Sequence, residues 1–469
     1  MVDPIKLANA INLHQQGELE QANAIYSSLL LTTPNHLQTL CLSGSIALQL
    51  GDHTRAIQLF TRASHLNPNL SSIYIQLGIC HSAINELEIA NTYYLNASRL
   101  SPDQVDPVVN LANNLTKLNR FQEAFDFYKK ALLLSPNSAV IHYNIGTMFL
   151  KSMKPEDARL WLEKTVALQE NHAAAWNSLG VARTECGNLE SAMEAYSTAS
   201  KYDPSLIEPY FNSHATLIDL KRPKEAISKL EQACKLAPLH TGYLFFLGML
   251  KEYFSEGLPD TALLDSLAKN EDVKHELESW QYLKSLDLRP ATLVGTNTKT
   301  IDLALKQASL DGLVLEFGVY NGKSIRNIAA LVNSAVYGFD SFQGIPENWN
   351  DEPTGSYSAN GTLPEVPSNV TLYQGWFEDT IPQFIQSHNG PIRFMNIDCD
   401  LYSSTKTIFD LLGPQIIPGT VIVFDEFIGY KSWKNDEFKA FQEAVAQYQW
   451  KYQILTFSFA SKQVAVKII

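Results

Sequence analysis

The sequence is poor in cysteine and has no long hydrophobic run. Five cysteines are scattered along the 469 residues, and none of them forms a C-x-x-C pair. This odd, scattered set argues against a disulfide framework or a zinc site. Residues 1–30 carry no apolar signal core. No stretch approaches the roughly 18–20 apolar residues of a membrane span. We therefore expect a protein of the reducing cytoplasm with no membrane partner.

Positive charge is scarce as well. The chain has 36 Lys+Arg against 49 Asp+Glu, which gives a net charge of −13. Proteins that bind nucleic acid present a basic stripe to the phosphate backbone, so we do not expect nucleic acid as a partner. The hydrophobic fraction of 45% and the charged fraction of 18% are typical of a folded protein. At about 150 residues per domain, the length predicts two or three domains.

The first half of the chain repeats itself every 34 residues. Four kinds of residue recur on this period: an alanine, a proline, an aromatic or large residue, and a small residue. The alanines are Ala22, Ala56, Ala90, Ala124, Ala158, Ala192 and Ala226, and the prolines are Pro34, Pro68, Pro102, Pro136, Pro204 and Pro238. The large residues are Tyr26, Phe60, Tyr94, Tyr128, Leu162, Tyr196 and Leu230, and the small ones are Ala10, Gly44, Gly78, Ala112, Gly146, Gly180 and Gly248. His214 interrupts the small column, and Glu170 fills the one gap in the proline column.

These columns resemble the tetratricopeptide repeat (TPR) family. The resemblance implies an all-α solenoid of helix pairs over residues 1–253, with about seven repeats and a partial cap. Proline ends each second helix because it lacks the amide donor, and Gly17, Gly51 and Gly187 fit the turn between paired helices. Such arrays usually bind a peptide or a partner protein on their concave face. A spacer or dimerisation platform is the alternative.

The period stops after Tyr253, and the residue pattern changes. Residues 254–275, which include Gly257 and Pro259, read as a linker. Residues 276–311 look helical, and short apolar runs then alternate with helical stretches as far as residue 469. The expected strands are 313–317, 336–339, 370–373, 394–397 and 421–424, with closing antiparallel strands at 452–459 and 464–469; the expected helices are 324–332, 381–387, 404–412 and 436–448. This alternation predicts an α/β domain at 276–469 with a mostly parallel sheet, and therefore an α + α/β multidomain protein.

A glycine loop opens the second domain. Glu316-x-Gly318-x-x-x-Gly322 follows an expected strand, and Ser324 opens the next helix. Glycines there let a ligand approach backbone amides at a positive helix end. Asp340 lies 18 residues after Gly322, but the G-x-G-x-x-G fingerprint is incomplete, which disfavours a nucleotide-dependent oxidoreductase. A plain strand–helix turn is the alternative.

Acidic residues follow two later strands. Asp398 and Asp400 come directly after one apolar run, and Asp425 and Glu426 come directly after the next. The carboxyl ends of parallel strands face a common crevice, so these side chains are candidates to share one Mg²⁺, which prefers oxygen ligands. Helix caps and solvated loop charges are the alternative interpretation.

Five motifs in this order resemble the macrocin O-methyltransferase family. They are Leu315-Glu316-Phe317-Gly318-Val319-Tyr320, Tyr337-Gly338-Phe339-Asp340-Ser341-Phe342-Gln343-Gly344-Ile345-Pro346, Gly375-Trp376-Phe377-Glu378-Asp379-Thr380, Ile397-Asp398-Cys399-Asp400-Leu401-Tyr402-Ser403-Ser404-Thr405 and Gly419-Thr420-Val421-Ile422-Val423-Phe424-Asp425-Glu426-Phe427. The resemblance implies a Rossmann-like class I methyltransferase that uses S-adenosylmethionine and Mg²⁺ to methylate a sugar hydroxyl.

The resemblance also implies roles for individual residues. The methionine end of the cofactor would be surrounded by Glu316, Gly318, Tyr320, Gly322 and Ser324. Asp340 would take the ribose hydroxyls, and Gly375 and Trp376 would flank the adenine. Asp398, Asp425 and Glu426 would hold the metal, through which Asp398 and Asp425 would serve catalysis.

The general base is left undetermined. No histidine lies between Asp340 and Thr380, and position 401 is leucine, where the catechol type of O-methyltransferase has a lysine. The insert at residues 347–369 is either a lid over the acceptor or an inert excursion. We expect an O-methyltransferase acting on a sugar, a glycan or a glycosylated metabolite, with the repeats recruiting a partner or the acceptor. The alternative is a scaffold with a catalytically silent methyltransferase-like domain.

Overall fold

The computed structural model describes residues 2–255, 260–286, 288 and 291–469. Its contacts divide the chain into two compact units, one made of Met1–Ser152 and Leu160–Glu170 and the other of Met153–Arg159 and Asn171–Ile469. The expected fold class is confirmed, with a helical repeat solenoid followed by a mostly parallel sheet. Gly257 and Pro259 of the expected linker lie outside the described residues. The rest of the linker contains α16 (Ala262–Leu267) and the short 3-10 helix η1 (Glu271–Val273).

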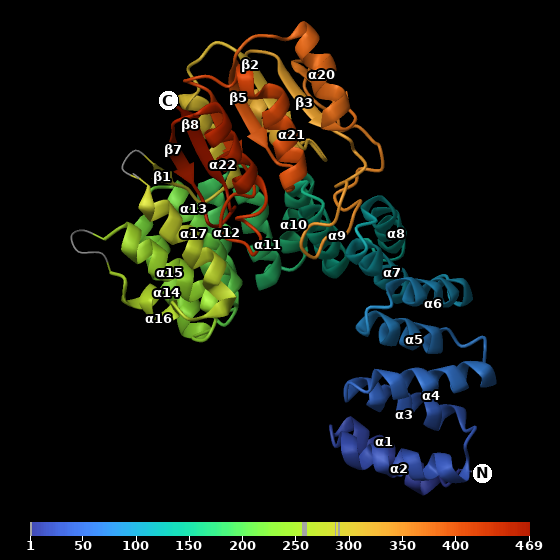
Figure 1. Cartoon of the computed structure of the whole chain (residues 1–469). Helices are drawn as coiled ribbons and strands as arrows, with labels where there is room; N and C mark the ends of the chain where they lie inside the picture. The colour runs from blue at the N-terminus through green and yellow to red at the C-terminus, as the bar shows by residue number, and fades with distance from the viewer. Residues whose placement is uncertain (1, 256–259, 287, 289–290) are drawn as a thin grey trace. The chain divides into compact units, whose positions relative to one another are not determined.

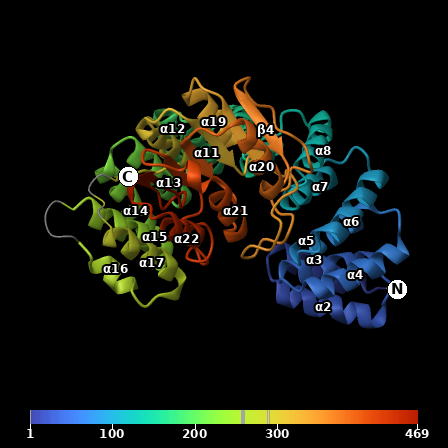
Figure 2. The ribbon, with the colours of Figure 1, turned by 45° about the horizontal axis from the view of Figure 1, so that its top comes forward.

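Helices α1 to α15 form the repeat array (Figure 1), and Figure 2 shows several of the stacked pairs. Their bounds are α1 Pro4–Gln15, α2 Leu19–Thr32, α3 Leu37–Gln49, α4 His53–Leu66, α5 Ser71–Ala83, α6 Leu87–Leu100, α7 Asp106–Lys117, α8 Phe121–Leu134, α9 Ala139–Lys151, α10 Pro155–Leu168, α11 Ala173–Glu185, α12 Leu189–Tyr202, α13 Glu208–Asp219, α14 Pro223–Leu236 and α15 Thr241–Tyr253. The second helix of a repeat ends shortly before the periodic proline, as the repeat pattern predicts.

The turn inside each repeat has a residue in the left-handed backbone region. Gly17, Gly51 and Gly187 occupy it with φ of 82°, 77° and 75°. In the other repeats the same 34-residue column holds Asn85, Asn119, Met153 and Lys221, all with positive φ. Glycine is favoured there because it carries no Cβ, and asparagine tolerates this conformation better than most residues. Each repeat therefore keeps a tight turn between its two helices, even where another residue stands in place of glycine.

The small column packs against the aromatic column of the same repeat. A methyl group built on Gly78 would overlap the ring of Tyr94, and one on Gly180 would overlap the ring of Tyr196. Both tyrosines are almost fully buried. Tyr94 also joins the apolar cluster of the following helix pair. The two columns are therefore complementary in volume, which is why they recur together.

One eight-stranded sheet forms the centre of the second domain. Its strands are β1 Thr292–Leu293, β2 Leu313–Phe317, β3 Val336–Asp340, β4 Val370–Gln374, β5 Ile392–Ile397, β6 Val421–Phe424, β7 Tyr452–Phe457 and β8 Val464–Ile468. The order across the sheet is β1-β7-β8-β6-β5-β2-β3-β4, and only β8 runs antiparallel to its neighbours. The helices are α17 Lys274–Ser285, α18 Asn297–Gln307, α19 Lys323–Leu331, α20 Phe377–Ser387, α21 Tyr402–Leu412 and α22 Glu437–Tyr448, with the short 3-10 helix η2 at Gly413–Gln415.

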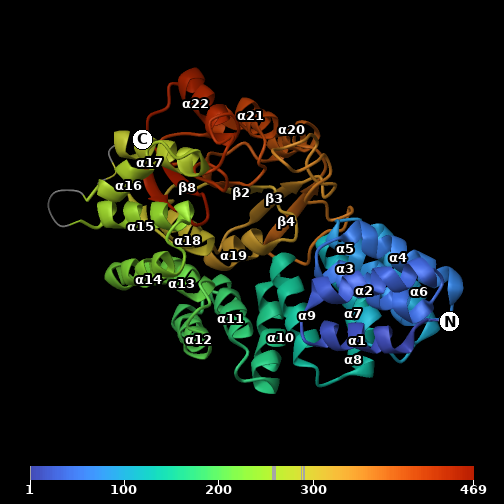
Figure 3. The same ribbon diagram turned by 90° about the horizontal axis from the view of Figure 1, so that it is seen from below.

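Helices cover both faces of this sheet. Figure 3 shows α20, α21 and α22 on one side and α18 and α19 on the other. The sequence-based expectation of one helical region at 276–311 is wrong in its middle. That region contains two helices, and strand β1 lies between them and pairs with β7. Because β7 lies far along the chain from β1, no local sequence pattern predicts β1.

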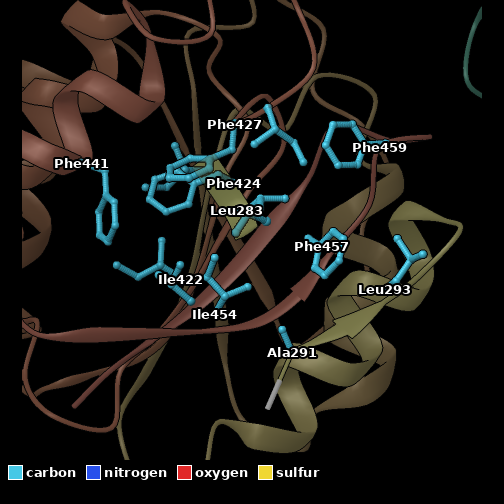
Figure 4. Close-up of a cluster of buried hydrophobic side chains, with 14 of the residues drawn as sticks. Leu283, Ala291, Leu293, Ile422, Phe424, Phe427, Phe441, Ile454, Phe457 and Phe459 are labelled. Carbon is cyan, nitrogen blue, oxygen red and sulfur yellow. The ribbon is translucent and has the colours of Figure 1, made fainter. Parts of the chain in front are cut away.

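The last repeats share a hydrophobic core with the sheet. The cluster extends from Leu217 and Phe245 in the repeats to Phe424 and Phe457 in the strands. The rings of Phe245 and Phe459 lie 5.2 Å apart, and Figure 4 shows Phe459, Phe457 and Leu293 among the side chains of this cluster. No helix among the described residues is long and apolar enough to cross a membrane.

The complementarity of the two repeat columns can be tested at Gly180. We expect Gly180→Ala to lower the free energy of unfolding by about 1–3 kcal/mol, because the added methyl group overlaps the buried Tyr196 ring. Urea unfolding monitored by circular dichroism measures the change. Gly390→Ala is the matched control, since a methyl group there meets no atom within 4 Å. An equal loss in both variants would contradict the packing argument.

Candidate active site

A cavity of about 590 Å³ opens at the carboxyl edge of the sheet. The loops that follow β2, β3, β4, β5 and β6 all contribute to its wall. The lining residues are Met153, Gly318, Tyr320, Asp340, Ser341, Gly344, Ile345, Pro346, Glu347, Trp349, Tyr357, Gly375, Trp376, Phe377, Glu378, Asp398, Cys399, Asp400, Ser403, Ser404, Thr407, Asp425 and Glu426. This volume lies within the range of small-molecule and cofactor sites, which is about 300–1,000 Å³.

Most of the predicted site residues meet in this cavity. The wall contains Gly318, Tyr320, Asp340, Gly375, Trp376, Asp398, Asp425 and Glu426. Glu316 in β2, Gly322 in the turn that follows and Ser324 at the start of α19 do not line it. The structure therefore brings the glycine loop and the acidic residues to one place, although they lie about a hundred residues apart in the sequence.

The glycine loop turns sharply between β2 and α19. Gly318, Tyr320 and Gly322 all have positive φ, at 85°, 48° and 81°. A methyl group built on Gly318 would overlap the main-chain oxygen of Asp398. Only glycine has neither the steric cost of this φ nor a side chain in the way. The first glycine of the loop is therefore required by the close approach of two backbone segments.

The carboxylate of Asp340 holds this loop. Oδ2 accepts hydrogen bonds from the amides of Val319 at 2.8 Å and Tyr320 at 2.7 Å, and Oδ1 accepts one from the Phe342 amide at 2.6 Å. A carboxylate offers about four acceptor positions, so three of them are engaged by the backbone. The predicted contact of Asp340 with ribose hydroxyls stays a prediction, and the structure adds this second role.

Glu316 is fully buried beneath the loop. Its Oε1 accepts from Asn396 Nδ2 at 2.9 Å, while Oε2 has no hydrogen-bond partner among the described residues. Burial raises the pKa of the Glu316 carboxyl to about 8, and the nearby polar side chains of Ser324 and Asn396 oppose this rise. A buried polar atom without a partner calls for an explanation. Protonation of Glu316, which the raised pKa favours, removes the cost of a buried charge there.

The acidic side chains that follow β5 and β6 lie close enough to repel one another when ionised. Burial, together with the nearby Asp425 carboxylate, raises the pKa of Asp398 well above its usual range. Burial raises the pKa of Asp400 to about 7 and that of Glu426 to about 8. Like charges in a poorly solvated wall disfavour ionisation. Such a wall favours a cationic ligand.

Two of the predicted metal ligands already have protein partners. Asp425 Oδ1 accepts from Asn297 Nδ2 at 2.8 Å and, over a shorter distance, from Gln463 Nε2. Glu426 Oε1 accepts from Lys462 Nζ at 3.3 Å. In the described part of the chain, no three His, Cys, Asp or Glu side chains group closely enough to hold a metal ion. The residues present therefore do not fit the expected Mg²⁺ site as they stand.

The insert at residues 347–369 contributes aromatic rings to the wall. Tyr357 packs edge-on against Tyr320 with ring centroids 6.5 Å apart, and Trp349 lies 5.9 Å from Tyr430. Glu347 Oε1 accepts from Ser403 Oγ at 2.6 Å, which ties the start of the insert to α21. The insert therefore borders the cavity, as a lid over the acceptor would.

Three features of this site were missed from the sequence. Met153, in a repeat turn, lines the cavity, and its carbonyl oxygen accepts from Asn321 Nδ2 at 3.3 Å. Lys323, at the start of α19, forms a short ion pair with Glu185 of α11. Asn297 and Gln463 hold Asp425. Only the left-handed repeat column marks Met153 as unusual, and the amide residues carry no local signal.

Comparison with known proteins identifies both parts of the chain. Residues 315–427 match the family model of a methyltransferase domain. Residues 7–70, 106–138 and 143–205 match models of the tetratricopeptide repeat. The chain thus carries N-terminal TPR repeats and a C-terminal methyltransferase domain. A methyltransferase domain of this kind implies S-adenosylmethionine as the methyl donor.

Two curated relatives are O-methyltransferases. Over 168 residues the chain is 27% identical to the 8-demethyl-8-(2,3-dimethoxy-alpha-L-rhamnosyl)-tetracenomycin-C 4'-O-methyltransferase of Streptomyces olivaceus, covering 30% of this chain and 60% of the relative. Over 159 residues it is 26% identical to the demethyldecarbamoylnovobiocin O-methyltransferase of Streptomyces niveus, covering 28% and 60%. The chain thus spans about 60% of the length of these relatives. Among solved structures, the TPR protein YrrB is 26% identical, covering 39% of this chain and 95% of YrrB with a TM-score of 0.33.

The three amide contacts make Asp340 a test of the glycine loop. We expect Asp340→Ala to weaken binding of S-adenosylhomocysteine by about tenfold or more, because three backbone donors lose a charged acceptor and the loop loosens. Isothermal titration calorimetry measures the dissociation constant. Asp311→Ala, at an exposed turn before β2, is the control and should bind as the wild type does. Unchanged affinity in Asp340→Ala would refute the role assigned to this carboxylate.

Burial of Glu316 predicts a dependence of stability on pH. Between an unfolded pKa of about 4.3 and the folded pKa of about 8, the folded chain keeps a proton that the unfolded chain has lost. The free energy of unfolding therefore falls as pH rises through this window. Glu316→Gln should reduce that fall, measured as urea midpoints from about pH 5 to about pH 8. Glu365→Gln, in the exposed part of the insert, should leave the slope unchanged, and an equal slope in Glu316→Gln would argue against this assignment.

Proposed function

We propose that this chain is an S-adenosylmethionine-dependent O-methyltransferase whose acceptor is a hydroxyl of a sugar, a glycan or a glycosylated metabolite. One observation carries the proposal: a glycine turn and several half-buried acids share one cavity at the carboxyl edge of a mostly parallel sheet. Ligands of open α/β sheets bind at this edge. The names of the two curated relatives, which are O-methyltransferases, support the choice of oxygen as the acceptor atom.

The cofactor fits the groups that line the cavity. The amides and carbonyl groups from Gly318 to Tyr320 would surround its amino-acid end, with Glu316, Gly322 and Ser324 shaping the turn from below. Asp340 would reach the ribose, and Gly375 and Trp376 would enclose the base. The acidic wall suits a ligand that carries an ammonium and a sulfonium group.

The chain's own residues would position the acceptor and take its proton. When bound, S-adenosylmethionine supplies an activated methyl group on sulfonium. Asp400 lines the cavity, and no hydrogen bond from another described residue reaches its carboxylate, whereas Asp425 and Glu426 are already engaged. We assign Asp400 as the base that receives the hydroxyl proton while the oxygen takes the methyl group. Asp398 and the aromatic rings of Tyr357 and Trp349 would orient the acceptor and exclude water.

The expected Mg²⁺ is kept as a separate proposal. Asp398, Asp425 and Glu426 would have to regroup to hold it, because their present arrangement does not form a metal site among the described residues. No step of the mechanism above passes through a metal. Calorimetric titration with MgCl₂, with and without S-adenosylhomocysteine, tests the proposal, and a complete lack of heat in both would remove it.

The repeat array would recruit a partner protein or the acceptor in the cytoplasm. TPR arrays commonly bind peptides on the concave face. A scaffold with a silent methyltransferase domain is the second candidate function. It is favoured because the acids of the described residues do not group as metal ligands and because no histidine lies between Asp340 and Thr380. A scaffold would not need to bind the cofactor. Calorimetry with S-adenosylmethionine at millimolar concentration therefore separates the two.

Substitution of Asp400 tests the mechanism. We expect Asp400→Asn to lower methyl transfer about 100-fold or more, because the amide cannot accept the proton, while S-adenosylhomocysteine affinity stays within about threefold. The acceptor probe is methyl α-L-rhamnopyranoside, since the name of the S. olivaceus relative places its acceptor on a rhamnosyl group. Mass spectrometry detects the methylated product. The control is Asp410→Asn on α21, which lies outside the cavity and should retain full activity. Full activity of Asp400→Asn would exclude Asp400 as the base.

A further inference from the structure

A buried carboxylate joins the last full repeat to the methyltransferase domain. Asp219 is the final residue of α13 and is only 8% exposed. Its Oδ1 accepts from the Gly295 amide at 2.7 Å, and its Oδ2 accepts from Thr296 Oγ1 at 2.7 Å. An acid at the C-terminal end of a helix opposes the helix dipole, and burial adds to this cost. The position is therefore poor for stability, which points to a role in orientation.

The segment that Asp219 contacts is clamped on both sides. On one side, a methyl group built on Gly295 would overlap the carbonyl oxygen of Ala215 in α13, so the two backbones touch. On the other side, the Val294 amide donates to the Phe457 carbonyl of β7 at 3.0 Å. Figure 3 shows α18, which begins directly after this segment, beside α13 and α14. The start of α18 is therefore fixed between the repeat and the sheet.

From this clamp, contacts run in sequence to the cavity. Thr296 caps α18, with its Oγ1 accepting from the Lys299 amide at 3.2 Å while donating to Asp219. Asn297, the first residue of α18, donates from Nδ2 to Asp425 Oδ1 at 2.8 Å. Asp425 lines the cavity. Two consecutive residues thus connect a repeat carboxylate to a carboxylate of the candidate active site.

Asp425 needs such support because its surroundings repel it. Asp398, Asp400 and Glu426 line the same wall, so a loosely held carboxylate would turn away from them. The two amides of Asn297 and Gln463 and the nearby Lys323 ammonium oppose that repulsion. Rotation of the first turn of α18 would withdraw one of the two amides.

We propose that Asp219 is a positioning residue, which sets the first turn of α18 and through Asn297 the orientation of Asp425. The last repeats are then part of the catalytic unit. The proposal rests on the proposed function only in taking the acidic wall that Asp425 shares with Asp398 and Asp400 to serve methyl transfer. Removal of the Asp219 carboxylate should lower kcat and leave the cofactor affinity unchanged, because the glycine loop and Asp340 lie outside this chain of contacts.

Amide hydrogen–deuterium exchange of the full chain tests the contact without any ligand. We expect Asp219→Ala to speed exchange about tenfold in residues 296–300 and in residues 424–427. The matched control is Glu252→Ala. Glu252 is another buried repeat carboxylate with two donors in the second domain, Trp280 Nε1 at 2.5 Å and Lys284 Nζ at 2.8 Å, but it does not lead to Asp425. Unchanged exchange at 424–427 in Asp219→Ala, or an equal increase in Glu252→Ala, would overturn the proposal.

Kinetics provide the second measurement. With methyl α-L-rhamnopyranoside as the acceptor probe, Asp219→Ala and Asn297→Ala should each lower kcat about tenfold or more, with the KM for S-adenosylmethionine changed less than about threefold. The double variant should be no slower than the slower single variant, because both changes break one chain of contacts. Asp219→Asn should recover part of the rate, since its amide can accept from Gly295 and donate to Thr296. Additive losses would overturn the proposal.

The two proposals fail in different ways. If the wild type neither binds S-adenosylmethionine nor forms S-adenosylhomocysteine, the proposed function fails, and the exchange contrast between Asp219→Ala and Glu252→Ala still decides the positioning contact. If the wild type is active and Asp219→Ala retains its full kcat, the positioning role fails and the proposed function stands.

Discussion

The close approach of two backbones, at Gly318 and Asp398, is the constraint on which the candidate active site depends. The turn after β2 lies so near the end of β5 that no side chain fits at position 318. Parallel pairing of β2 with β5 sets the register of this approach, and the Asp398 amide donates to the Phe317 carbonyl at 2.8 Å. The same contact that forces a glycine therefore places the amides of the loop beside the first acid of the wall. Asp340 then fixes the loop from the β3 side.

The electrostatics of the wall follow from this arrangement. Strands that end at one edge deliver their following residues to one small volume, and here several of those residues are acids. Burial and the neighbouring carboxylates raise the pKa of Asp398, Asp400 and Glu426, so ionising these acids together is unfavourable unless a positive charge lies beside them. A cationic ligand would lower the free energy of that wall. The arrangement is therefore better suited to a sulfonium donor than to an anionic nucleotide phosphate.

Local pattern was enough to predict most of the fold. The 34-residue columns predicted the repeat helices because volume complementarity, as between Gly78 and Tyr94, must recur at every pair. Apolar runs predicted β2 and β6 with the bounds that the structure shows, since a strand buried on both faces leaves no other pattern. Strand β1 was missed because two residues pairing with β7 carry no local signature. At the site, the motif residues were found, whereas Asn297 and Gln463 were not, because their contacts with Asp425 depend on tertiary structure alone.

The repeat array is divided between two compact units. Its first helices belong to one of them, and its last helices belong to the unit that contains the sheet. The later helices share a core with the sheet through Phe245 and Phe459, and they place Asp219 against the start of α18. A partner bound to the later repeats would act on the same packed unit that holds Asp425. A shift of α13 must then shift the start of α18, because the backbones of Ala215 and Gly295 are so close that not even a methyl group fits between them.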